Sequence, residues 1–117
     1  MVSTTLVGRR EEERAAAFVA SLGYRVLERN YRCRSGELDI IAEDGGCLVF
    51  IEVRSRSHRE HGDAMDAAGV AKMRQVAKVA EHYLARKRPP HRDIRIDVIA
   101  ITAGEIEHII DAHFMDA

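Results

Sequence analysis

The sequence predicts an α/β fold in which one mixed central sheet is flanked by helices, with the elements in the order αβββαββ. Two segments carry apolar residues at helical spacing, five shorter segments have strand patterns, and the composition suits a soluble domain. Of the 117 residues, 46% are hydrophobic and 32% are charged, so the chain can bury a core and remain soluble. This length fits one domain, which we expect to cover residues 1–117.

Two amphipathic helices are expected, one before the first strand and one after the third. Ala15, Phe18, Val19 and Leu22 repeat at i, i+3, i+4 and i+7, which predicts a helix over roughly residues 6–22. A second apolar stripe predicts a helix over roughly residues 66–87, and the two prolines that follow it at 89 and 90 end it.

Five segments are expected to form strands. Alternating patterns predict strands at residues 24–31, 37–43 and 47–54, and the Asp-Gly-Gly sequence at 44–46 is typical of a tight turn. Residues 94–102 are apolar on both faces at their centre, which indicates a covered position in the sheet. Residues 105–110 are expected to form a short edge strand.

The hairpin at 37–54 has a register that follows from its turn. If the two glycines after Asp44 form a two-residue turn, counting outward pairs Asp39 with Glu52. Directly opposed residues point to the same face, with Cβ atoms about 4.5–5.5 Å apart. We therefore expect the two carboxylates to lie side by side, with Arg54 facing the same way.

The two opposed acids allow two interpretations. Like charges on neighbouring strands repel, and Glu52 lies within an apolar run, where desolvating a charge is costly. A bound Mg²⁺ or Mn²⁺ would relieve both costs, because such ions take one or two carboxylates and keep several water molecules. The alternative is an ion pair between Glu52 and a basic neighbour such as Arg54. Spacing alone leaves both interpretations open.

A third acid can come from the first helix. Glu11 and Glu12 both border its apolar stripe at the N-terminal end, so either carboxylate can face the sheet. The alternative is that these acids only interact with the helix dipole, which favours acids in a first turn.

Several protein classes are excluded or disfavoured by composition. No apolar run approaches the roughly 20 residues that cross a bilayer, and the first ten residues lack the apolar region of a signal peptide. We therefore expect a cytoplasmic protein without membrane contacts, in which Cys33 and Cys47 are reduced. An aromatic content of 5%, with no Trp, argues against a base-stacking platform for single strands.

Several sequence motifs of this chain resemble those of a known family. The segments GELDIIA at 36–42 and LVFIEVRSR at 48–56 resemble the core of that family. The segments GYRVL at 23–27 and NYRC at 30–33 resemble the part that precedes this core. The likeness continues through AEHYL at 80–84, DVIAI at 97–101 and IEHIIDAHF at 106–114. Nearly the whole chain thus resembles the YraN-like family of predicted bacterial endonucleases.

This resemblance implies a restriction-endonuclease-like, three-layer domain of the PD-(D/E)xK type, similar to archaeal Holliday-junction resolvases. It implies metal-dependent phosphodiester hydrolysis, with Asp39 as the motif Asp, Glu52-Val53-Arg54 in the place of (D/E)xK, and Glu12 as the first-helix Glu. The implied cofactor is Mg²⁺ or Mn²⁺, held by Asp39, Glu52 and Glu12. The implied partner is DNA, branched or flapped, and a homodimer is left open.

Clustered arginines would contact the DNA backbone in such a protein, since Arg suits bidentate phosphate contacts. The predicted contacts are Arg32, Arg34, Arg56 and Arg59. The alternative is that this richness in Arg is compositional bias.

One departure from the family pattern concerns Arg54, which stands where the motif has Lys. A guanidinium stays protonated and serves poorly as a proton relay, so we expect weak cleavage with nucleic-acid binding retained. Lys72, beside the apolar stripe of the second helix, is a candidate substitute. The rival functions are a non-catalytic nucleic-acid-binding module and a protein-interaction scaffold.

Overall fold

The computed structural model describes residues 4–56 and 69–112, and within them the elements follow the predicted order αβββαββ. The helices are α1 (Thr4–Ser21) and α3 (Val70–Lys87). The strands are β1 (Arg25–Cys33), β2 (Gly36–Asp44), β3 (Cys47–Arg56), β4 (Asp93–Thr102) and β5 (Glu105–Ile109).

The five strands form one mixed sheet in the order β1-β2-β3-β4-β5. Strands β3 and β4 run parallel, and the other neighbours run antiparallel. Helix α3 lies in the connection between the two parallel strands, as a parallel pair requires. Residues 96–102 of β4 are all buried, which confirms the covered position predicted for this strand.

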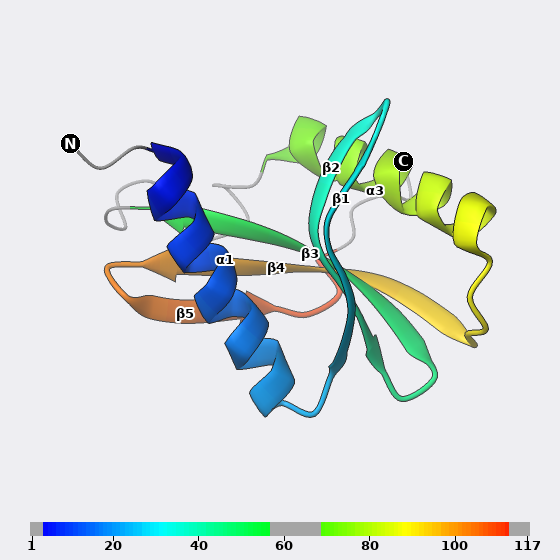
Figure 1. The fold of residues 1–117 in the computed structure, drawn as a ribbon, viewed down its shortest axis with the longest axis horizontal. Coiled ribbons are helices and arrows are strands. Elements are labelled where there is room, and N and C mark those ends of the chain that lie inside the picture. Colours follow the sequence, from blue (N-terminus) through cyan, green and yellow to red (C-terminus); the bar gives the residue numbers. More distant parts are fainter. Residues whose placement is uncertain (1–3, 57–68, 113–117) are drawn as a thin grey trace.

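Each face of the sheet is covered by one helix, which gives three layers (Figure 1). On one face, Ala15 and Val19 of α1 pack with Ile51 of β3. On the other face, Met73 of α3 packs with Phe50 of β3. Side chains from β3 alternate between the two cores, as expected for a central strand. The fold is therefore α/β and of the restriction-endonuclease-like kind.

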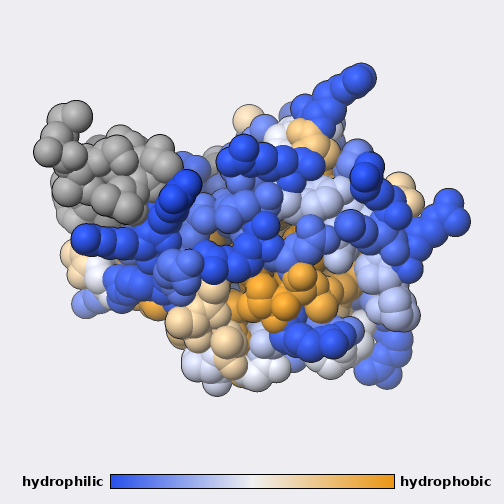
Figure 2. All heavy atoms as spheres, viewed as in Figure 1, coloured by the Kyte–Doolittle hydropathy of each residue, from blue (hydrophilic) through white to orange (hydrophobic). Residues whose placement is uncertain are grey.

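One face of the molecule is mostly polar. Figure 2 shows hydrophilic side chains over most of one face, around an apolar patch near its centre. Neither of the two helices in the described part of the chain is long and apolar enough to span a membrane.

The element boundaries differ from the predicted ones by a few residues. Strand β3 continues to Arg56, two residues beyond its predicted end. Helix α3 begins at Val70 because Gly69 has φ 77°, which is not helical; the predicted helical residues 66–68 lie outside the described residues.

The hairpin of β2 and β3 has the predicted register only as far as Ile40. Asp44 pairs with Cys47, and the ladder continues to Ile40 opposite Ile51, where it ends. Asp39 and Glu52 therefore do not form the backbone pair that the arithmetic predicted. Strand β2 continues its pairing with β1 as far as Gly36, so the β1–β2 hairpin extends away from β3 (Figure 1).

A twist in β2 explains this separation. Leu38 and Ile40 are two residues apart and would share one face of a regular strand. Leu38 instead packs in the core beside α3, whereas Ile40 packs in the core beside α1. The strand therefore turns about its axis at Asp39, between them.

Candidate functional site

The site begins where β2 and β3 separate. Beyond the last ladder pair, the backbone N–H of Val53 has no β2 carbonyl opposite it. It donates instead to Oδ2 of Asp39, at 2.8 Å. The side chain of Asp39 thus takes over a ladder hydrogen bond, which fixes the carboxylate in the gap between the strands.

Glu52 lies beside Asp39 in this gap, as the sequence predicted. The two carboxyl groups lie close enough for each to alter the pKa of the other. Only 3% of Glu52 is exposed. Burial, and then the Glu52 carboxylate, raises the pKa of Asp39 to about 7. Burial also raises the pKa of Glu52, and the nearby Lys72 and Arg54 oppose this change.

Two cations lie near Glu52, Arg54 from the same strand β3 and Lys72 from α3. Nη1 of Arg54 lies 3.6 Å from Oε2 of Glu52, and Nζ of Lys72 lies 3.7 Å from the same oxygen. The ion pair that the sequence left open is therefore present, and a second cation from α3 joins it. Both distances exceed that of a hydrogen bond, so neither cation is tightly bound to the carboxylate.

Glu12 approaches the pair from α1. Burial, and then the charges of Asp39 and Glu37, raise the pKa of Glu12, so its carboxylate lies near that of Asp39. Glu12 also lines a surface pocket of about 330 Å³. Glu11 points elsewhere, because its Oε2 accepts a hydrogen bond from Ser55 at 3.3 Å. Of the two candidate acids, Glu12 is the one that α1 directs to the site.

The donor set fits a divalent cation held by few protein ligands. In residues 4–56 and 69–112, no three His, Cys, Asp or Glu side chains converge to form a complete cage. Mg²⁺ needs no such cage, because one or two carboxylates with water molecules satisfy it. The half-buried carboxylate of Asp39 and the buried carboxylate of Glu52 have the charge and the oxygen donors for such an ion.

The pattern of the family described as "Uncharacterised protein family UPF0102" matches residues 11–101. The chain belongs to the UPF0102 family. A UPF0102 protein of Persephonella marina is 38% identical over 93% of this chain and 94% of its own length. One from Geobacter sulfurreducens is 45% identical over 92% of this chain and 88% of its own length. The resemblance to the YraN-like family is thereby confirmed.

Two of the four arginines predicted to contact DNA have side chains that the structure of this UPF0102 chain describes. Arg32 is exposed and pairs with Glu37 at 3.1 Å, and Arg34 is exposed near the end of the β1–β2 hairpin. Only the backbone of Arg56 is described, and Arg59 lies outside the described residues. These positions stay predictions.

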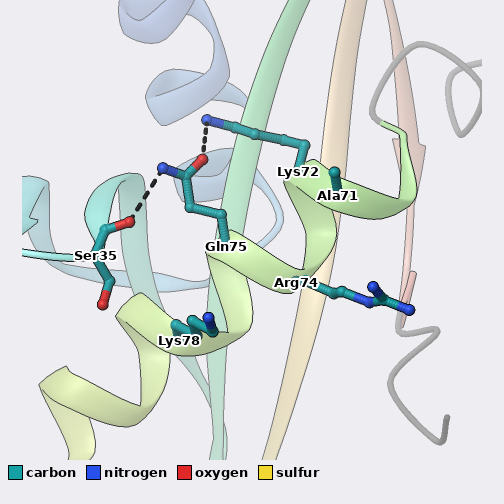
Figure 3. A pocket seen from close by; sticks show the side chains of 6 residues that line it. All are labelled: Ser35, Ala71, Lys72, Arg74, Gln75 and Lys78. Carbon is teal, nitrogen blue, oxygen red and sulfur yellow. Dashed lines mark hydrogen bonds between the residues drawn. The ribbon is translucent and has the colours of Figure 1, made fainter.

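A basic groove on α3 was missed by sequence reasoning. It has a volume of about 540 Å³, and Figure 3 shows the side chains that line it. They are Ser35, Ala71, Lys72, Arg74, Gln75 and Lys78. The spacing of residues 72, 75 and 78 along one helix face was a usable signal, but only the fold shows that the β1–β2 turn lies opposite them.

Asp97 has a structural role in this UPF0102 fold. It is fully buried. It accepts hydrogen bonds from Arg95 Nε at 3.0 Å, His108 Nε2 at 2.7 Å and the backbone N–H of Asp111 at 2.9 Å. The carboxylate thus joins β4 to β5 and to the residues that follow β5.

Proposed function

We propose that this UPF0102 protein is a cytoplasmic, divalent-metal-dependent endonuclease that hydrolyses phosphodiester bonds in branched or flapped DNA. The single observation that carries the proposal is the proximity of the Asp39 and Glu52 carboxylates where β2 leaves β3. Two acids buried together repel and lose hydration, a cost that a bound cation offsets. The preference for branched DNA rests on the likeness to Holliday-junction resolvases.

Asp39 and Glu52 would hold Mg²⁺ or Mn²⁺, with Glu12 acting through a water molecule or at a second position. When bound, the ion would lower the pKa of a coordinated water and offset charge on the attacked phosphate. The hydrogen bond from Val53 fixes one oxygen of Asp39. The carboxylate is therefore held in a fixed orientation before any ligand arrives, which favours both binding and catalysis.

Hydrolysis makes a bond from the water oxygen to phosphorus and breaks the bond from phosphorus to the leaving sugar oxygen. One water proton goes to solvent, and the leaving oxygen is protonated. A guanidinium is a poor proton relay, so the role of Arg54 would be to stabilise the charge of the pentacovalent transition state. Lys72 carries an ammonium with rotatable donors, which suits it to orient the attacking water.

A second function is favoured by one observation, that Arg54 stands where the nuclease motif has Lys. With no efficient proton relay, the same fold would bind nucleic acid and turn over slowly or not at all. The two functions share the fold and the DNA interface, and differ in the rate of the chemical step.

The experiment that tests the proposal is a cleavage panel with Mg²⁺ and with Mn²⁺ over linear duplex, flap and four-way-junction DNA. We expect metal-dependent cleavage, faster on the flap or the junction than on the duplex, and none from Glu52→Gln. Metal-dependent DNA binding without cleavage of any substrate would favour the binding module. Cleavage that persists in Glu52→Gln would place the activity elsewhere.

A further inference from the structure

The groove between α3 and the β1–β2 turn has a strongly one-sided charge. Of its six lining residues, three are the cations Lys72, Arg74 and Lys78, and none is an acid. Arg74 and Lys78 are exposed, and neither forms an ion pair within residues 4–56 and 69–112. Their charges therefore remain available to an anionic ligand.

Two consecutive hydrogen bonds line the floor of the groove. Gln75 donates from Nε2 to the carbonyl oxygen of Ser35 at 3.1 Å, and Lys72 donates from Nζ to Oε1 of Gln75 at 3.3 Å (Figure 3). Gly36 permits this approach, because a Cβ at that position would lie 2.5 Å from Nε2 of Gln75. The glycine at position 36 thus allows the β1–β2 turn to lie close to α3.

Lys72 connects the groove to the acid pair. Its Nζ contacts Gln75 in the groove and also lies 3.7 Å from Oε2 of Glu52. A chain of phosphates bound along α3 would therefore extend from the groove to Asp39 and Glu52. Residues 72 and 78 are separated by six helical steps, or about 9 Å, whereas phosphates of one strand rise about 3.4 Å per nucleotide along a duplex. The groove is long enough for more than one phosphate.

We propose that this groove binds the phosphate backbone of the DNA strand on one side of the bond to be cleaved, and leads it to Asp39 and Glu52. The choice of DNA as the ligand rests on the proposed function. The flexible cations and the absence of aromatic residues among the lining side chains suit backbone contacts and not base recognition. Arg74 and Lys78 supply the outer contacts, and Lys72 supplies the contact nearest the acid pair.

The test measures binding of a fluorescein-labelled four-way junction in EDTA, so that no cleavage occurs, over a series of salt concentrations. The variant is Arg74→Gln with Lys78→Gln. The matched control is Arg86→Gln with Lys87→Gln, which removes the same charge from the other end of the same helix. Equal thermal midpoints of the three proteins would show that all of them fold.

We expect the groove variant to bind more weakly and to lose roughly two units of the log–log salt slope, about one for each phosphate contact removed. The control should keep the wild-type slope. Equal slopes in the groove variant and the wild type would overturn the proposal, as would an equal loss in the control or no wild-type binding.

Because this readout is binding in EDTA, it is separate from catalysis. A wild-type chain that binds through the groove and never cleaves would refute the endonuclease and support the groove. A chain that cleaves a junction while the groove variant binds as tightly as the wild type would refute the groove alone.

Discussion

Val53 donates its backbone N–H to Oδ2 of Asp39 at 2.8 Å, and this hydrogen bond replaces a rung of the β2–β3 ladder. The hydrogen bond therefore makes the position of a site carboxylate depend on the path of the β3 backbone. The strands separate at this point, and the carboxylate that fills the gap satisfies the donor that the separation leaves. Asp39 is thereby held next to Glu52, although the two residues do not pair through their backbones.

Binding of Mn²⁺ should stabilise the wild-type protein and not Asp39→Asn. The amide oxygen of Asn can still accept the Val53 hydrogen bond, so the fold should be kept while one anionic ligand is lost. At a concentration one hundred times its dissociation constant, a cation bound only by the native state adds about 2.7 kcal/mol. Thermal unfolding across a Mn²⁺ series measures this increment.

In EDTA, without a bound cation, the order of thermal stability should reverse. Asp39→Asn should then be at least as stable as the wild type, because one of two neighbouring like charges is gone. Glu52→Gln should also lose the Mn²⁺ increment. An undiminished increment in both variants would place the cation at another site.

Asp97 should stabilise the protein in a pH-dependent way. Burial acts to raise its pKa, but hydrogen bonds from His108, Arg95 and Asp111 outweigh burial and lower it. Since the folded pKa lies below the unfolded value of about 3.9, the stabilisation is complete above that pH and is lost as pH falls through the folded pKa.

Urea denaturation of Asp97→Asn tests this. Above about pH 5 the variant should be less stable by roughly 3 kcal/mol, because Arg95 loses its buried partner. The difference should shrink below about pH 4, where Asp97 of the unfolded wild-type chain takes up a proton before that of the folded protein does. A difference that stays constant down to pH 3 would contradict the lowered pKa.

The sequence predicted correctly those features that depend on local residue patterns, and it did not predict those that depend on tertiary structure. Hydrophobic periodicity and the glycine turn were enough for the element order, for the ladder from Asp44 to Ile40, and for the meeting of Asp39 with Glu52. The separation of β2 from β3 was not predictable, because counting assumes a regular ladder. The groove on α3 was missed because its opposite wall, Ser35, is distant in sequence.

Gly36→Ala should destabilise the protein and widen the groove. Gly36 has φ 140°, where L side chains are strained, and a Cβ there would lie 2.5 Å from Nε2 of Gln75. We expect a loss of about 1–3 kcal/mol in urea denaturation. The steric part should be relieved in Gly36→Ala with Gln75→Ala, so the double variant should be more stable than the sum of the single losses predicts. Strict additivity would show that the backbone strain acts alone.

Arg54 and Lys72 should have different effects on cleavage, although they lie at similar distances from Glu52. The guanidinium remains protonated and stabilises charge, whereas an ammonium is compact and its donors rotate toward water. We therefore expect weak wild-type cleavage, a faster rate in Arg54→Lys, and a loss of about 100-fold in Lys72→Met, the size typical of a group that stabilises a transition state.

Single-turnover cleavage of a flap and a four-way junction measures these rates, with Glu52→Gln as the inactive control. Lys72→Arg separates the two roles of Lys72. If only positive charge is needed beside Glu52, Lys72→Arg should retain the wild-type rate, whereas a water-orienting role predicts a rate near that of Lys72→Met. Robust wild-type cleavage that falls in Arg54→Lys would show that Arg54 is itself a working catalytic group. In that case the replacement of the motif lysine is an adaptation of the site, and Lys72 serves to hold Glu52 and the DNA strand.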